Sequence, residues 1–216
     1  SANRGACNQI CRRAYTVKDI DSEIELEIDN EYIMSPKDLK TIDFLNIMLD
    51  SGVRVFKIEG RARAPEYVKT VVSCYKEAVE AYLEDDFTQE KIDNWNKRLS
   101  KVFNRGFWNG YYLGQRLGEW SANYGSDATH KKVYIGKVTN YFTKIGVAEI
   151  YVEAQYVSKG DEMLIIGETT GVYEDTIEEL RVDLQAVDKA VKGEYFSVKT
   201  KELVRRNDKV YKFIRK

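Results

Sequence analysis

The sequence holds few of the residues on which secreted frameworks and metalloprotease sites depend. It contains three cysteines and one histidine in 216 residues. Three cysteines are too few, and too odd in number, for a secreted disulfide framework, so we expect reduced thiols. The sequence also lacks a His-Glu-x-x-His zinc helix and a Gly-x-Ser-x-Gly nucleophile elbow. The sequence therefore carries neither the zinc-metalloprotease signature nor the serine-hydrolase signature.

An excess of one charge and a long apolar run are missing as well. The 34 basic and 35 acidic side chains leave a net charge of −1, so the chain as a whole has no field that steers it onto nucleic acid or anionic lipid. The first residues lack the charged-then-apolar pattern of a signal peptide. We therefore expect a cytoplasmic protein with no membrane partner. The chain begins at Ser1 and reads there like the middle of a longer sequence, which favours a fragment.

The first 85 residues show an α/β rhythm. Residues 23–34 alternate in polarity and predict a strand or hairpin, and residues 35–38 look like a helix start with a capping serine and a first-turn proline. That helix is expected to end at residues 51–52, before a short apolar strand over residues 53–58 and a second helix opened by Pro65. Strands that alternate with helices imply a parallel sheet, and so few strands cannot close a barrel.

The remainder divides into a linker region and a β domain. A helix is expected over residues 89–102, followed by an aromatic stretch at 103–112 that either stacks on bases or packs an interface between the two halves. Six short β segments separated by glycine turns then predict a small antiparallel barrel, at residues 133–142, 145–152, 162–166, 172–182, 186–198 and 203–214. The expected domains are residues 1–85, 86–130 and 131–216.

The three thiols raise the hypothesis of a cysteine protease. His130 is the sole histidine that could serve as base for Cys7, Cys11 or Cys74, and it could do so only if the domains fold together. Cys7 and Cys11 stand four positions apart, so both could reach one soft metal or iron–sulfur centre, or else pack an N-terminal segment. Cys74 lies beside the apolar stripe of its helix, which favours core packing. Residues 50–52 resemble an aspartic-protease triplet but read better as a helix end.

The loop after residue 58 gathers the strongest candidates for chemistry. In parallel α/β folds, ligands bind outside the carboxyl ends of the strands. Arg61 and Arg63 stand there and could clamp a phosphate or carboxylate together with backbone N–H groups of the next helix. Lys57 and Glu59 share one side of the expected strand and could shift each other's proton affinity. The alternative is an internal network of ion pairs that holds the loop.

The C-terminal stretch is locally basic. Residues 199–216 contain eight lysines and arginines against Glu202 and Asp208. Such a segment could contact an RNA backbone. Its charges are interleaved with apolar residues, however, so a half-exposed strand with a solvated face is the alternative.

Taken in succession, four blocks resemble the collagenase-like peptidase family U-32. They are NRGACNQICR at residues 3–12, YIMSPKDL at 32–39, FKIEGRARAPEY at 56–67 and FNRGF at 103–107. The resemblance covers essentially the whole chain, and the order of the blocks would rarely arise by chance. It implies that residues 1–85 are the last part of a (β/α)8-like catalytic domain, and that the β domain is similar to the translation-factor barrel of elongation factor Tu.

The resemblance also implies two activities. Family members are catalogued as peptidases, and some relatives take part in hydroxylation of RNA bases or ubiquinone precursors with a 4Fe-4S cluster held by four cysteines. One such ligand maps to Cys7, and Cys11 matches a second cysteine of the collagenase-like branch. Two further ligands would lie upstream of this chain, and position 40, often cysteine in relatives, is Lys40.

We therefore predict a peptidase of this family whose isolated chain is incomplete and inactive. The alternatives are an iron–sulfur-dependent RNA-modifying factor and a β-barrel module that binds RNA or protein. No cofactor is expected in this chain alone, and a 4Fe-4S cluster is the expectation for the full-length parent. Lys57, Glu59, Arg61 and Arg63 are the predicted catalytic residues, and Cys7 with Cys11 would form half of a metal site. The sequence predicts no oligomeric state.

Overall fold

The computed structural model describes residues 8, 10–18, 20, 21, 32–61 and 63–216. The chain divides into two compact units, Ser1–Glu59 with Thr70–Ala128, and Gly60–Lys69 with Thr129–Lys216. The regular structure is mostly β-sheet with few helices, so the mixed α/β plus β expectation holds at this coarse level. The strand expected over residues 23–34 lies almost wholly outside the described residues.

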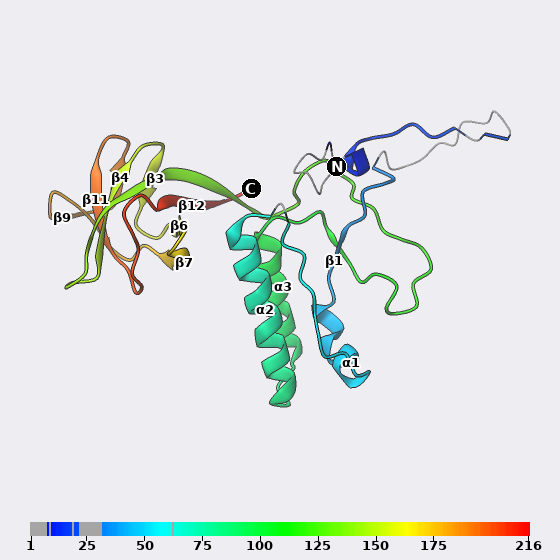
Figure 1. Cartoon of the computed structure of the whole chain (residues 1–216). Coiled ribbons are helices and arrows are strands. Elements are labelled where there is room, and N and C mark those ends of the chain that lie inside the picture. Colours follow the sequence, from blue (N-terminus) through cyan, green and yellow to red (C-terminus); the bar gives the residue numbers. More distant parts are fainter. Residues whose placement is uncertain (1–7, 9, 19, 22–31, 62) are drawn as a thin grey trace. The chain divides into compact units, whose positions relative to one another are not determined.

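Two long helices are the main elements outside the β-sheet, and both were predicted (Figure 1). Helix α2 (Pro65–Leu83) begins at the expected proline, and α3 (Gln89–Lys101) begins after Thr88, whose hydroxyl accepts from the backbone N–H of Lys91 at 3.4 Å. The two helices are joined by Glu77, which accepts hydrogen bonds from Trp95 and Arg98.

The buried face of α2 agrees only in part with the predicted one. The helical period of the sequence predicts an apolar stripe of residues 68, 71, 72, 75, 79, 82 and 83, of which Val71 is buried, whereas Val68, Val72 and Leu83 are exposed. The face that is buried carries mostly small side chains: Val71, Cys74, Ala78 and Ala81. A 3.6-residue period identifies the helix, but the residues on either side of the predicted stripe repeat with the same period. Small side chains allow a neighbouring element to pack closely, which explains why the side with Cys74, Ala78 and Ala81 is buried.

The predicted helix start at Ser35 is wrong. Residues 38–39 form the short strand β1 (Asp38–Leu39), and helical structure begins only with the 3-10 turn η3 (Ile42–Phe44), followed by α1 (Leu45–Asp50). The extended segment is held by backbone hydrogen bonds to two other parts of the chain, which outweigh the local helix signals. The end of the helix was predicted correctly. Gly52, at φ +92°, donates to the carbonyl of Leu49 at 3.0 Å, so residues 50–52 are a helix end.

Residues 53–58 do not form the predicted strand. No strand in the described part of the chain pairs with them, and Val55 is 84% exposed. A strand is held by hydrogen bonds to a neighbouring strand, so apolar alternation alone cannot create one.

An antiparallel sheet dominates the second unit. Its eight strands lie in the order β7-β6-β12-β3-β4-β11-β8-β9. Their bounds are β3 (His130–Phe142), β4 (Val147–Val152), β6 (Glu162–Gly167), β7 (Gly171–Thr176), β8 (Leu180–Val182), β9 (Gln185–Val187), β11 (Tyr195–Lys199) and β12 (Lys209–Arg215). Strands β5 (Tyr156–Ser158) and β10 (Lys189–Val191) form a separate pair.

The sheet curves around one core. Tyr173 of β7 and Leu180 of β8, which belong to strands far apart in the sheet order, pack in the same buried cluster as Ile150 and Phe196 of the central strands. All six predicted β segments contain strand residues. Two are subdivided, however, because residues 172–182 hold β7 and β8, and residues 186–198 hold parts of β9, β10 and β11.

Among the described residues, no helix combines the length and the apolar character that crossing a membrane requires.

Candidate functional site

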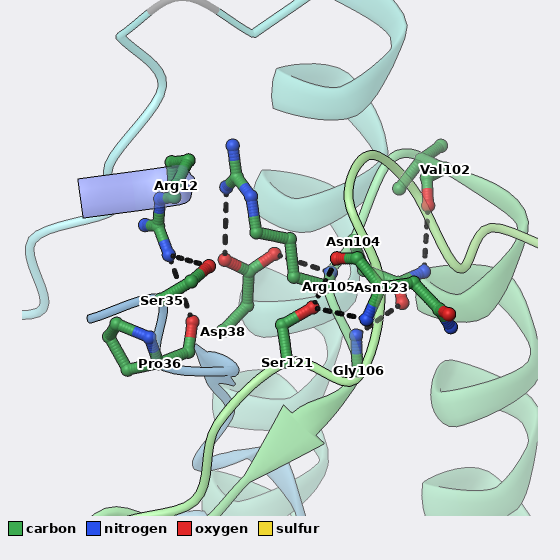
Figure 2. Close-up of polar contacts among 10 residues, drawn as sticks. All are labelled: Arg12, Ser35, Pro36, Asp38, Val102, Asn104, Arg105, Gly106, Ser121 and Asn123. Atoms are coloured by element: carbon green, nitrogen blue, oxygen red, sulfur yellow. Dashed lines mark hydrogen bonds and ion pairs between the residues drawn. The ribbon is translucent and has the colours of Figure 1, made fainter. Parts of the chain in front are cut away.

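The extended segment at residues 35–40 is the centre of a polar cluster in the first unit (Figure 2). On one edge its backbone pairs with residues 119–121: Lys37 donates to the carbonyl of Glu119 at 3.0 Å, and Ser121 donates to the carbonyl of Ser35 at 2.8 Å. On the other edge β1 pairs in parallel with β2 (Phe107–Trp108), and Asp38 donates to the carbonyl of Gly106 at 2.9 Å. Sequence-distant blocks thus meet at one short strand.

Asp38 and Arg105 form the ionic part of this cluster. The carboxylate of Asp38 accepts from the backbone N–H of Arg105 at 3.1 Å, and its other oxygen lies 3.6 Å from the Arg105 guanidinium. Both side chains are largely shielded, at 19% and 17% exposure. The guanidinium also lies over the ring of Phe103, 5.0 Å from its centroid. The ion pair therefore fixes the loop that follows α3 against β1.

Arg12 brings the cysteine block to the same place. It belongs to the 3-10 turn η2 (Ile10–Arg12), and its guanidinium donates to the hydroxyl of Ser35 at 2.9 Å and to the carbonyl of Pro36 at 3.1 Å (Figure 2). Ser35 is only 3% exposed, so its hydroxyl serves as an acceptor within the cluster and does not cap a helix. Cys11, the residue before Arg12, is exposed.

Two buried polar residues complete the surrounding turns. The amide of Asn104 donates to the carbonyl of Val102 at 2.9 Å, and its oxygen accepts from the backbone of Gly106 at 3.1 Å. The hydroxyl of Ser121 donates to the carbonyl of Asn123 at 2.8 Å. Asn104 and Ser121 are 3% and 1% exposed. Their hydrogen bonds satisfy backbone groups that a buried loop would otherwise leave unpaired.

Lys40 is a structural residue next to this cluster. Its ammonium donates to Asn96 of α3 at 2.6 Å and lies 2.8 Å from the carboxylate of Asp43. The amide of Asn96 in turn donates to Asp43 at 2.6 Å. Lysine at this position therefore connects the residue-40 segment to α3.

The predicted catalytic residues lie outside the polar cluster. Lys57 and Glu59 are exposed and belong to the first unit, whereas Arg61, also exposed, and Arg63 belong to the second. The guanidinium of Arg63 lies over the ring of Tyr67, 5.0 Å from the centroid. Their catalytic role stays a prediction.

The aromatic stretch after α3 is partly exposed. Trp108 and Tyr111 meet edge to face, with ring centroids 5.2 Å apart, whereas Tyr111 and Tyr112 are 62% and 60% exposed. The stretch therefore contributes both to β2 and to the surface of the first unit.

The thiols have different surroundings. Cys7 lies outside the described residues. Cys74 is fully buried in α2, as predicted, and burial raises its pKa to about 11, which makes it a poor nucleophile. The Nδ1 of His130, the sole histidine, lies 2.9 Å from the hydroxyl of the neighbouring Thr129. A Cys74–His130 dyad is thus a poor explanation for activity, because a buried thiol cannot reach a substrate.

We expect the two described cysteines to react at very different rates. At pH 8 only about one thiol in a thousand is ionised when its pKa is near 11, and Cys74 has no exposed surface. Alkylation with iodoacetamide, followed residue by residue with peptide mapping, should modify Cys11 in the folded chain and Cys74 only after unfolding in urea. Equal rates in the folded chain would contradict the buried position of Cys74.

The described residues do not fit an iron–sulfur cluster. Such a cluster is held by four thiolates. Cys11 is exposed and Cys74 is enclosed by the core, and within the described ranges no three His, Cys, Asp or Glu side chains lie close enough to hold a metal ion together.

Comparison with known proteins decides the family. The sequence profile of peptidase family U32 matches residues 1–122, which include all four of the sequence blocks that carried the resemblance. The chain belongs to peptidase family U32. The resemblance to the U32 family that the sequence blocks indicated is therefore confirmed.

This U32 chain has relatives with two kinds of names. It is 61% identical over 213 residues to a collagenase of Porphyromonas gingivalis (99% of this chain, 51% of the relative). It is 35% identical over 216 residues to an uncharacterized protease of Methanocaldococcus jannaschii (97% and 52%). It is also 32% identical over 189 residues to tRNA hydroxylation protein P1 of Bacillus subtilis (82% and 43%). The chain thus spans about half the length of the curated relatives it matches.

The sequence did not predict which residues of the U32 blocks contact one another. Arg12, Asp38 and Arg105 each stand in a block that carried the resemblance, but their spacing along the chain gives no sign that they meet. Contact between segments 23 to 67 residues apart depends on the tertiary path of the backbone.

We expect Asp38→Ala to destabilise the first unit of the U32 chain by about 2 kcal/mol. The change removes the carboxylate that accepts the hydrogen bond from the Arg105 backbone, and the shielded Arg105 guanidinium loses this counter-ion. All three tryptophans, Trp95, Trp108 and Trp120, lie in this unit, so urea unfolding followed by tryptophan fluorescence measures it. Glu119→Gln, which removes the more exposed pair with Lys37, is the control, with an expected change below about 0.5 kcal/mol. Equal effects of the two variants would contradict the structural role of Asp38.

Proposed function

We propose that the protein to which this chain belongs is a peptidase that acts on a protein substrate. One observation carries the proposal, the 61% identity over 213 residues to a protein named collagenase. Collagen and its denatured form, gelatin, are accordingly the first substrates to test. Because the chain spans about half of that relative, the activity is proposed for the whole protein and not for the isolated chain.

The proposed catalytic residues are Lys57, Glu59, Arg61 and Arg63. Glu59 and Lys57 are exposed side chains that can exchange protons with a bound substrate, and Arg61 and Arg63 carry guanidinium groups suited to carboxylates. In this proposal the cluster of Arg12, Ser35, Asp38 and Arg105 is structural. Its polar groups bind one another and so hold the segments of the first unit together.

The test is hydrolysis of fluorescein-labelled gelatin by the whole protein. Glu59→Gln, which keeps the size of the side chain and removes its charge, is expected to lower kcat/KM by about 100-fold or more. Glu84→Gln, an equally conservative change at an exposed position after α2, is the control and should keep full activity. Gelatin left intact by the native protein would overturn the peptidase proposal. Full activity of Glu59→Gln would overturn the role of this residue alone.

We also propose the finer architecture that the family resemblance implies. In it, residues 1–85 are the last part of a (β/α)8-like domain, and residues 131–216 form a barrel similar to the second domain of translation factors. Helix α2, which follows the loop that begins after residue 58, supports the first part. The curved sheet around one core supports the second.

A second candidate function is hydroxylation of RNA bases. The observation in its favour is the 32% identity over 189 residues to a tRNA hydroxylation protein. A 4Fe-4S cluster in the whole protein would need Cys7, Cys11 and further thiolates from outside this chain. Mass spectrometry of RNA from cells that lack the protein tests it, since a nucleoside heavier by one oxygen atom should be lost. An unchanged nucleoside profile would contradict this function. A cytoplasmic location stays a prediction.

A further inference from the structure

The outer face of the β unit carries an ordered row of tyrosines and lysines. Cross-strand partners lie on the same face of a sheet, and the ladder pairs Lys209 of β12 with Lys137 of β3, Lys137 with Tyr151 of β4, and Tyr151 with Tyr195 of β11. The next residues along the strands are enclosed in the core: Val138, Ile150, Phe196 and Val210. Because side chains alternate along a strand, the row faces away from the core.

The tyrosine pair presents aromatic surface at the β4–β11 end of this row. The rings of Tyr151 and Tyr195 lie with centroids 4.8 Å apart and planes tilted by 39°. Tyr195, the first residue of β11, is 54% exposed. An exposed ring beside a second ring offers a surface on which a flat, unpaired base can stack.

A second row repeats the combination farther along the strands. Phe142 of β3 pairs with Val147 of β4, which pairs with Lys199 of β11. Phe142 is 43% exposed, and Lys199 is exposed as well. Lys199 stands four residues beyond Tyr195 on β11, a separation of about 13 Å along a strand. The two rows thus span the length of two or three nucleotides of an extended strand.

The carboxylates on this face are already engaged. Glu153 accepts from Tyr134 at 2.6 Å and lies 3.0 Å from Lys137, and these hydrogen bonds lower its pKa. Glu149 accepts from the hydroxyl of Thr139 at 2.7 Å. Lys137, Lys199 and Lys209 are exposed lysines on the same face.

The basic C-terminal segment contributes less than its sequence indicates. Lys212 of β12 points inward, at 5% exposure, where its ammonium lies 2.8 Å from the carboxylate of Asp161 and 3.9 Å from the centre of the Tyr156 ring. Lys209, three positions earlier, is exposed. The alternation of the strand therefore assigns Lys209 to the outer face and removes Lys212 from it.

We propose that the outer face of β3, β4, β11 and β12, which carries Tyr151 and Tyr195, binds single-stranded RNA. Bases stack on the tyrosines, and Lys199 and Lys209 contact the phosphates. RNA offers both flat bases to the exposed rings and phosphates to these two lysines, whereas an uncharged proline-rich peptide offers the lysines no anion. The proposal goes beyond the peptidase activity and does not depend on it.

The test measures the binding of a fluorescein-labelled 12-nucleotide oligouridine to the full chain by fluorescence anisotropy. We expect a Kd near or below about 10 µM in low salt, weakening steeply as salt rises. Tyr195→Ala should weaken binding by about 5- to 100-fold, and Tyr195→Phe, which keeps the ring, should restore it. Lys209→Gln should weaken binding and lower the salt slope by about 0.7. Tyr124→Ala, at another exposed tyrosine, is the matched control.

Several results would overturn the proposal. These are native binding by Tyr195→Ala, affinity that does not change with salt, equal binding of a double-stranded RNA of the same length, and absence of binding to the native chain. A gelatin peptide that binds the native chain and competes with the RNA would assign the face to a protein partner instead. Circular dichroism of Tyr195→Phe and Tyr195→Ala separates lost binding from lost folding.

Discussion

Replacing Gly136 with alanine is expected to unfold the β unit or to destabilise it by about 3 kcal/mol or more. A Cβ at this position would stand 1.8 Å from the carbonyl oxygen of Tyr151 and 2.9 Å from its carbonyl carbon. Both atoms belong to the backbone of β4, paired with β3 across a ladder, so neither strand can yield without breaking hydrogen bonds. The cost is steric, because the backbone of Gly136 is not in the left-handed region.

Hydrogen exchange of peptides from residues 129–216, followed by mass spectrometry, measures this effect within the β unit. Gly171→Ala is the matched control, since Gly171 has φ +72° and an added Cβ there meets nothing within 4 Å. Only the strain of a left-handed alanine, about 1 kcal/mol, is expected. Native-like protection in Gly136→Ala would show that β3 and β4 do not approach as closely as described.

Asp161→Ala is expected to destabilise the β unit by about 3 kcal/mol, because it leaves a buried ammonium without its counter-ion. The side chain of Lys212 is 7% exposed and lies 2.8 Å from the Asp161 carboxylate. The same carboxylate accepts from the backbone N–H of Ser158 at 2.9 Å. Lys212→Met should cost much less, about 1 kcal/mol or below, since Asp161 is 25% exposed and can be hydrated when the lysine is removed.

The difference in cost between Asp161→Ala and Lys212→Met distinguishes a buried ion pair from an exposed pair of neighbouring charges. Urea unfolding followed by far-UV circular dichroism measures the three proteins. Glu179→Ala, which removes the partner of Arg181 in an exposed pair, is the control and should leave the unfolding curve unchanged. Equal costs for Asp161→Ala and Lys212→Met would contradict the burial of the ammonium.

Sequence signals that act within a few residues, such as those that start or end a helix, gave correct predictions. Pro65 marks the start of α2 and Gly52 marks the end of α1, because each of these residues acts through its own backbone. Cys74 was expected in the core, and it is buried. The succession of sequence blocks identified the family, since motif order requires no knowledge of contacts.

The two wrong predictions, a helix start at Ser35 and a strand at residues 53–58, have one cause. Whether such a segment becomes a helix or a strand depends on hydrogen bonds with backbone that is distant in sequence. Ser35 carries every local sign of a helix cap, yet residues 35–40 are extended because residues 106–108 and 119–121 satisfy their hydrogen bonds. Residues 53–58 alternate like a strand, but the described part of the chain provides no neighbour for their backbone. Helix starts and strands of this kind are decided by what lies beside them.

The sequence by itself determined the family, the two long helices and the β character of the last third of the chain. Those features depend on local propensity, side-chain periodicity and motif order, which a linear chain displays. Only the tertiary structure decided that Arg12, Ser35, Asp38 and Arg105 form one polar cluster, and that Lys209 faces outward while Lys212 is buried. Both depend on pairing between segments far apart in sequence, and a shift of one residue in that register would reverse the side on which each strand residue lies.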